Sequence, residues 1–141
     1  MPRQNTRIES EGAEFLVLGQ LLIAGIPAYK AYTNMKGYDL VATNPDANTS
    51  ARISVKSRWK TRAEGFIIKN FECDFVVIVK LNRGPAKIMP VEYFVLPVAY
   101  VKSLKRSKDW GKISFSTIRD MEKYRGLWGP IREFLARAPE P

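Results

Sequence analysis

Apolar and polar residues change their spacing several times along the chain, and each change marks a predicted element. From about Thr6 to Ala24 a long apolar stretch with glutamates near its start predicts a helix, which Gly25 ends. Residues 38–43 and 51–58 alternate between apolar and polar side chains, as half-buried strands do. The polar, proline-containing stretch 44–50 predicts a connection between antiparallel neighbours, so the two strands form a hairpin.

The strongest strand signal lies further along, at residues 74–81, where a near-continuous apolar run indicates burial on both faces. Weaker patterns predict strands at 26–32, within 88–97 and at 113–115, short helices at 98–104 and 131–137, turns at 33–37 and 82–85, and a loop at 59–71. This order predicts an α/β fold in which a mixed central sheet of about five strands is flanked by helices. At 141 residues the chain is expected to form a single domain over 1–141, with frayed ends at 1–5 and 138–141.

The predicted hairpin brings an acidic residue next to a lysine. If the strands pair symmetrically about the middle of the connection, Asn44 lies opposite Ala51 and Asp39 lies opposite Lys56. Because side chains alternate along a strand, Ser54 shares the face of Lys56. A carboxylate that holds Mg²⁺ beside an ammonium group suits phosphodiester chemistry. A simple cross-strand salt bridge is the alternative interpretation.

The charge balance narrows the range of partners. The chain has 23 lysines and arginines against 14 acidic residues, a formal net charge of +9. This excess favours a polyanionic partner, with DNA as the first candidate and an anionic membrane surface as the alternative. The sequence has no signal peptide and no apolar run of spanning length, so we expect a cytoplasmic protein that does not enter a membrane.

The residues that the chain lacks exclude several kinds of chemistry. It contains no histidine and one cysteine, Cys73. This composition excludes an internal disulfide, a standard zinc site and histidine-dependent catalysis. Carboxylates, lysines, hydroxyls and oxygen-bound metals remain. We expect Cys73 to be a small buried residue without a chemical role.

Four features in order give the chain a family resemblance: Ala13-Glu14 in the first helix, Gly37-Tyr38-Asp39, Ser54-Val55-Lys56, and the apolar strand that starts at Asp74. This arrangement resembles the PD-(D/E)XK nuclease superfamily, with small uncharacterised bacterial members most similar and archaeal Holliday-junction resolvases more distant. The resemblance implies a restriction-endonuclease-like fold and metal-dependent endonuclease activity that hydrolyses DNA phosphodiester bonds.

The resemblance also assigns roles to individual residues. It implies that Asp39 binds the metal, Mg²⁺ or Mn²⁺, that Lys56 is the catalytic lysine, and that Glu14 is an additional catalytic and metal-binding carboxylate. Ser54 occupies the position of the usual acidic motif residue and supplies only a neutral hydroxyl, which weakens direct metal binding. As a catalytic residue it is expected to orient water or the metal indirectly. For Glu14 a surface ion pair remains an alternative, and Glu11, one turn earlier, is the fallback ligand.

Basic residues after the hairpin predict a path for nucleic acid. Arg58, Lys60, Arg62 and Lys69 are candidates for contacts with phosphates, and Trp59 either stacks on a base or covers the core. A second basic group comprises Lys102, Lys105, Arg106 and Lys108. Only a location on the same side as Asp39 would support its involvement with DNA; otherwise it is a solvated surface.

Two other functions remain open at this point. The chain is alternatively a catalytically lapsed nuclease fold that binds DNA without cutting it, which Ser54 favours, or an interaction protein with no role on nucleic acid. Many superfamily members act as dimers, so the resemblance implies a homodimer, although the sequence carries no coiled-coil signature.

Overall fold

The predicted first helix forms α1, Thr6–Ile23, in the computed structural model, which describes residues 6–31 and 37–137. One stripe of α1 is fully buried and consists of Ala13, Val17 and Leu21. Gly25 ends the helix with a φ of +81°. The N–H of Ile26 donates to the carbonyl of Leu21 at 2.9 Å, the bond of a Schellman cap.

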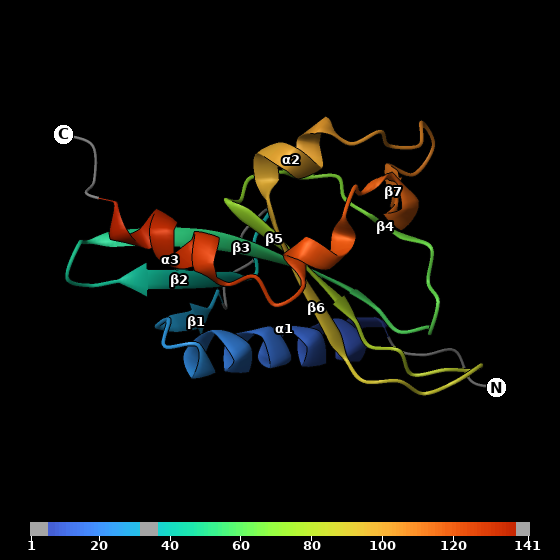
Figure 1. Ribbon diagram of the computed structural model, residues 1–141, viewed down its shortest axis with the longest axis horizontal. Coiled ribbons are helices and arrows are strands. Elements are labelled where there is room, and N and C mark those ends of the chain that lie inside the picture. Colours follow the sequence, from blue (N-terminus) through green and yellow to red (C-terminus); the bar gives the residue numbers. More distant parts are fainter. Residues whose placement is uncertain (1–5, 32–36, 138–141) are drawn as a thin grey trace.

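A five-stranded mixed sheet with the order β1-β2-β3-β5-β6 forms the centre of the structure and confirms the predicted fold class (Figure 1). Its strands are β1 (Ala28–Lys30), β2 (Leu40–Asn44), β3 (Thr49–Arg58), β5 (Phe75–Lys80) and β6 (Glu92–Pro97). Only β3 and β5 are parallel, and the other neighbours are antiparallel. The residues of β5 from Phe75 to Val79 are all buried, as their apolar run predicts.

Two apolar layers cover the sheet, one on each face. On the first face α1 and α3 (Gly129–Ala136) pack on inward-facing residues such as Leu40, Ile53 and Val77. On the second face α2 (Val98–Ser103) and the small β4–β7 sheet pack on Val76 and Ile78. Alternation along β5 assigns its residues to the two layers.

The second layer contains structure that the sequence did not predict. The predicted loop 59–71 contains β4 (Gly65–Ile67), which pairs antiparallel with β7 (Lys112–Ser114). The strand predicted at 113–115 therefore belongs to this separate two-stranded sheet. Two 3₁₀ helices, Phe115–Thr117 and Met121–Tyr124, follow it. Pairing between segments more than 40 residues apart leaves no local signal in either segment, which explains the omission.

Other boundaries differ modestly from the predictions. The strand predicted at 26–32 forms only between Ala28 and Lys30, and the strand material predicted from residue 88 begins at Glu92. The predicted turn 33–37 lies outside the described residues except for Gly37, as do the predicted frayed ends. No helix within residues 6–31 and 37–137 is long and apolar enough to cross a membrane.

The cysteine and two of the aromatic residues are buried in the second layer, whereas Trp59 is partly exposed. Cys73 is a free thiol in the second layer, and burial followed by the nearby charge of Asp74 raises its pKa to about 11. Phe94 and Phe115 are buried in the same layer. Trp59 is 38% exposed, so it is not a core residue.

Candidate active site

The hairpin that carries the candidate site has a different register from the predicted one. Asn44 pairs with Thr49 and not with Ala51, because the connection is a four-residue turn, 45–48. Asn48 adopts a φ of +55° and its N–H donates to the carbonyl of Pro45 at 3.3 Å. The predicted pairing of Asp39 with Lys56 is therefore wrong by two residues. Such a shift preserves the alternation, so the face of each side chain is unchanged.

Backbone hydrogen bonds hold Asp39 between two strands. Its N–H donates to the carbonyl of Ile53 at 2.8 Å, and its carbonyl accepts from the N–H of Ala31 at 3.0 Å. The Asp39 carboxylate accepts a further bond, of 2.8 Å, from the N–H of Val55. The sheet thus fixes the direction of this carboxylate.

A cleft of about 340 Å³ lies beside Asp39. Its polar lining includes three predicted catalytic residues and one predicted nucleic-acid contact: Glu14, Asp39, Lys56 and Arg58. Ser10 of α1 and Ser57 of β3 also line it, while Phe66 and Ile67 of β4 form an apolar wall. The helix, the hairpin and β4 therefore meet at one open, mainly polar cavity.

A buried lysine connects the carboxylates of α1 to the sheet. The side chain of Lys30, at the end of β1, is only 4% exposed. Its ammonium group donates a hydrogen bond to Glu11 and lies 3.4 Å from a carboxylate oxygen of Glu14. Glu14 is therefore in an ion pair, as in the alternative interpretation, but with side chains only 4% and 17% exposed the pair is largely buried and not at the surface.

The pKa shifts at this site follow from burial and crowding of charge. Burial raises the pKa of Asp39, against the hydrogen bond from Val55 and the positive charge of Lys56. Burial and then the negative charge of Asp39 raise the pKa of Glu14, against Lys30. Burial alone would lower the pKa of Lys30, but its hydrogen bond with Glu11 and the charge of Glu14 raise it.

The two carboxylates fit a partly hydrated cation. Within the described part of the chain, no three side chains of His, Cys, Asp or Glu are close enough to form a metal site. Mg²⁺ is commonly held by only one or two carboxylates and takes its other ligands from water and phosphate. Asp39 and Glu14 match such a pair, since the negative charge of Asp39 contributes to the raised pKa of Glu14.

Arg58 is the predicted phosphate contact that lies in the cleft. Its Nε atom is buried and has no hydrogen-bond partner within the described structure. A buried donor of this kind gains free energy when an acceptor reaches it. The positive charge of Arg58 also lowers the pKa of Glu9, which burial raises more strongly, so Arg58 lies near the first turn of α1.

The remaining predicted site residues lie outside the cleft lining. Ser54 is 3% exposed and does not line the cavity. Lys60, Arg62 and Lys69 are exposed. The strand ends at Arg58 and Arg62 has a φ of +65°, so Arg58, Lys60 and Arg62 do not follow one another along an extended strand.

Two parts of the site were not predicted from the sequence. Lys30 was not singled out, although a single lysine within the apolar segment Ala28–Tyr32 is a usable signal for a buried, paired cation. The wall formed by Phe66 and Ile67 has no such signal, because it depends on the long-range pairing of β4.

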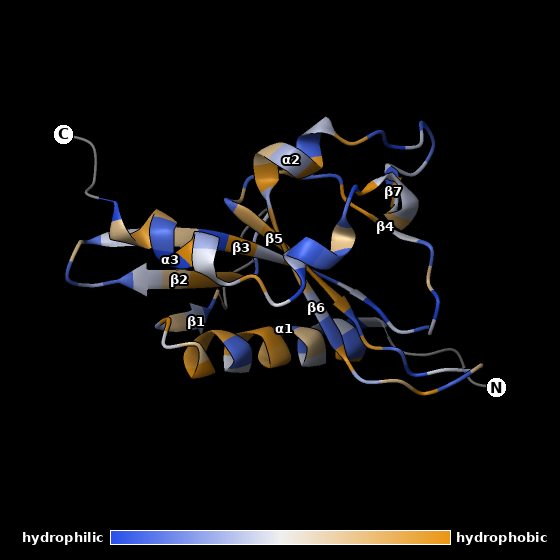
Figure 2. Ribbon diagram, viewed as in Figure 1, coloured by the Kyte–Doolittle hydropathy of each residue, from blue (hydrophilic) through white to orange (hydrophobic). Residues whose placement is uncertain are grey.

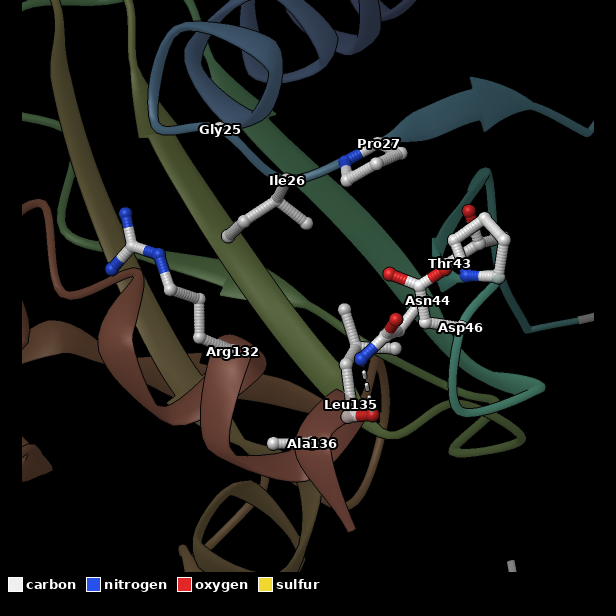
Figure 3. A pocket seen from close by; sticks show the side chains of 10 residues that line it. Gly25, Ile26, Pro27, Thr43, Asn44, Asp46, Arg132, Leu135 and Ala136 are labelled. Carbon is white, nitrogen blue, oxygen red and sulfur yellow. Dashed lines mark hydrogen bonds between the residues drawn. The ribbon is translucent and has the colours of Figure 1, made fainter. Parts of the chain in front are cut away.

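A second cavity, of about 450 Å³, lies between the end of α1, the β2–β3 turn and α3 (Figure 3). Asn44 donates a hydrogen bond of 3.2 Å to the carbonyl of Leu135 at its edge, and Arg132 donates to the carbonyl of Ala24. None of the predicted site residues lines it. Asn44 and Arg132 thus use polar groups of this cavity to join α3 to the rest of the fold.

We expect Gly37→Ala to destabilise the protein by about 3 kcal/mol, through left-handed backbone strain and steric overlap. Gly37 has a φ of +89°, and an added Cβ would lie 2.4 Å from Oδ1 of Asn70 and 2.8 Å from Cβ of Glu72. Gly126→Ala is the control: its φ is +57° but the space is open, so we expect a loss of about 1 kcal/mol. Urea unfolding of both variants measures the difference, and equal losses would contradict the close approach at Gly37.

No protein-family model matches the chain, and no curated protein shows significant sequence similarity to it. Among solved structures, the fold is similar to that of a bacterial homing endonuclease, I-Ssp6803I, with a TM-score of 0.64 and 20% sequence identity. The match covers 95% of this chain and 96% of that chain. The chain therefore shares, over nearly its whole length, the fold of that bacterial homing endonuclease.

Proposed function

We propose that this chain is a metal-dependent endonuclease of the PD-(D/E)XK type that hydrolyses DNA phosphodiester bonds and acts in the cytoplasm. One observation carries the proposal: Glu14, Asp39, Lys56 and Arg58 line one open cleft, although they come from α1, the residue before β2, and β3. The shared fold with a homing endonuclease and the net charge of +9 support it.

Each side chain of the cleft has a chemical role in this proposal. Asp39 and Glu14 hold Mg²⁺ or Mn²⁺, which when bound supplies an activated water and neutralises charge on the phosphate. Lys56 stabilises the negative charge that develops on the phosphoryl oxygens. Arg58 offers its free Nε–H to a phosphate oxygen, which positions the backbone of the nucleic acid.

Cleavage of supercoiled, linear, single-stranded and branched DNA in Mg²⁺, Mn²⁺ or EDTA tests the proposal. We expect metal-dependent cutting by the wild type that is lost in both Asp39→Ala and Lys56→Ala. Equal cutting by the wild type and the two variants would identify a contaminating nuclease. Absence of cutting by the wild type on every substrate would refute the proposed activity.

A catalytically lapsed DNA-binding protein is the second candidate, and Ser54 favours it. The hydroxyl of Ser54 is buried and gives the cleft no third carboxylate. This candidate predicts DNA binding that is sensitive to salt, without cleavage, and that survives Asp39→Ala. Binding and cleavage assays on the same protein separate the two functions.

The outer face of α1 supports the predicted homodimer as part of this proposal. Ile8, Phe15 and Leu22 recur every seven residues and are 66%, 50% and 53% exposed. Gly12 and Gly19 lie between them, with no atom within 4 Å of an added Cβ. Figure 2 shows the hydrophobic residues along α1. In a two-fold symmetric dimer the large apolar side chains of one α1 would pack into the gaps at the glycines of the other, so this face is suited to a second copy of the chain.

We expect the wild type to be dimeric and Leu22→Glu to be monomeric, because the new carboxylate would be buried between two helices. Ile88→Glu is the control, since Ile88 is equally an exposed apolar residue, 66% exposed, but lies outside α1. Light scattering across a range of protein concentrations measures the mass. A monomeric wild type, or a dimeric Leu22→Glu variant, would exclude this interface.

A further inference from the structure

A dense group of cations occupies the segment that links α2 to β7, residues 102–112, here called the basic loop (Figure 1). Its five cations are Lys102, Lys105, Arg106, Lys108 and Lys112, against one acid, Asp109. All five are exposed, and none forms an ion pair within the described part of the chain. Such uncompensated charge concentrates polyanions near this surface.

The basic loop is hollowed and held in shape. Two adjoining cavities, of about 440 and 230 Å³, share Arg106 and Ser107 in their linings. The N–H of Ser107 donates to the carbonyl of Lys112 at 2.9 Å, and the Lys112 N–H donates to the Ser107 hydroxyl at 3.0 Å. Gly111 adopts a φ of +68° against the carbonyl of Ile68, where a Cβ would lie at 3.2 Å. The cations are therefore presented on an internally bonded loop.

An exposed aromatic side chain stands among these cations. Trp110 is 66% exposed, between Lys108 and Lys112. Indole rings exposed beside cations provide stacking or apolar contact for bases and sugars, in addition to the attraction of phosphates. An exposed indole ring does not increase solubility, so solubility alone does not explain this surface.

The basic loop is joined directly to the wall of the candidate active site. Lys112 of β7 lies opposite Ile67 of β4, and Ile67 lines the cleft. The guanidinium of Arg106 lies 4.8 Å from the centre of the Phe71 ring. Asn70 and Glu72, the neighbours of Phe71, lie close enough to Gly37 that a Cβ added there would overlap them, and Gly37 is two residues before Asp39. The second basic group is thus on the same side as Asp39, and this location supports its involvement in DNA binding.

We propose that the basic loop is a second DNA-binding surface, in which Lys102, Lys105, Lys108 and Lys112 contact backbone phosphates and Trp110 contacts a sugar or base. This inference extends the proposed function and rests on it, because it requires that the chain acts on DNA. DNA bound to the basic loop would extend across the β4–β7 sheet to reach the cleft. The loop therefore contributes affinity and orientation, while the cleft contributes chemistry.

Binding of duplex DNA in EDTA, measured between about 50 and 200 mM salt, tests this inference without any cleavage step. For Lys105→Gln/Lys108→Gln we expect the slope of log affinity against log salt to become less negative by about 2. Arg132→Gln/Arg137→Gln is the matched control, because it loses the same charge at α3, which lies towards the other end of the molecule (Figure 1). Its slope should stay close to that of the wild type.

Trp110→Ala has a different expected signature. We expect roughly a tenfold loss of affinity with an unchanged salt slope, since the ring carries no charge. A Lys105→Gln/Lys108→Gln variant that behaves like the control, or a wild type that does not bind duplex DNA, would overturn the inference. If the wild type cleaves DNA but Lys105→Gln/Lys108→Gln has the same salt slope as the wild type, only the DNA-binding role of the basic loop is refuted. If the salt slope of this variant becomes less negative but the wild type never cleaves DNA, the role of the basic loop is supported and the nuclease activity is refuted.

Discussion

Asp39→Asn is expected to reduce DNA cleavage at least about a hundredfold and, at the same time, to raise the thermal stability of the metal-free protein at neutral pH. The amide retains an oxygen that accepts the hydrogen bond from the N–H of Val55, so the backbone geometry is preserved. It removes the negative charge that, in the proposed function, holds a divalent cation whose binding contributes several kcal/mol to the reaction. A large catalytic loss without a structural loss is the signature of a metal ligand.

The gain in stability follows from the direction of the pKa shift. Burial raises the pKa of Asp39 in the folded state, so the folded protein binds this proton more tightly than the unfolded chain does. Ionised Asp39 therefore costs stability at neutral pH, and this cost disappears as the pH falls below the usual range of an aspartate. The melting temperature of Asp39→Asn should exceed that of the wild type at pH 7, and the two should converge in acid.

Lys56→Gln is the comparison for this experiment. We expect a loss of cleavage of about 10²–10³-fold, because the proposed role of Lys56 is to stabilise charge that develops in the transition state. Titration of metal binding should show weakened binding in Asp39→Asn and retained binding in Lys56→Gln. If both variants bind metal as the wild type does, Asp39 is not a ligand. A lower melting temperature of Asp39→Asn at pH 7 would contradict the assigned cost of its charge.

Lys30→Met is expected to destabilise the protein by about 3 kcal/mol, because it leaves the carboxylate of Glu14 without its buried cation. The Lys30 ammonium lies 3.4 Å from Glu14 and also bonds to Glu11. Glu14 already carries a cost from burial and from the charge of Asp39. The raised pKa of Lys30 means that its contribution is complete at neutral pH and is lost only when alkaline pH removes its proton.

The double variant Lys30→Met/Glu14→Gln separates electrostatics from packing. Since the amide needs no counter-ion, we expect it to recover a substantial part of the lost stability in chemical unfolding. Glu133→Gln, an exposed acid on α3, is the control and should recover nothing in the Lys30→Met background. No recovery in the double variant would indicate that Lys30 acts through packing of its aliphatic chain.

The sequence was sufficient for elements with a strong local pattern. The stripe of α1, the Gly25 stop and the fully apolar β5 each follow from residues within one segment. The shared cleft of Asp39 and Lys56 also followed, because alternation on paired strands determines the face even when the register is shifted by two residues.

The hairpin register itself required contacts from a distant part of the chain. Asn44 and Thr49, the pair that closes the turn, both donate side-chain hydrogen bonds to the carbonyl of Leu135 in α3. The predicted register assumed symmetric pairing about the connection, which could not take account of these hydrogen bonds to α3. The left-handed conformation of Asn48 then closes the turn in four residues.

By itself, the sequence determined a basic α/β chain with a five-stranded mixed sheet and an acid and a lysine on one face of a hairpin. Only the tertiary structure decided that Lys30 joins Glu11 and Glu14, that β4 walls the cleft, and that the basic loop lies beside it. The physical reason is range: periodicity reports which face of its own segment a residue occupies. Which distant segment that face meets depends on long-range packing and pairing, which no local pattern encodes.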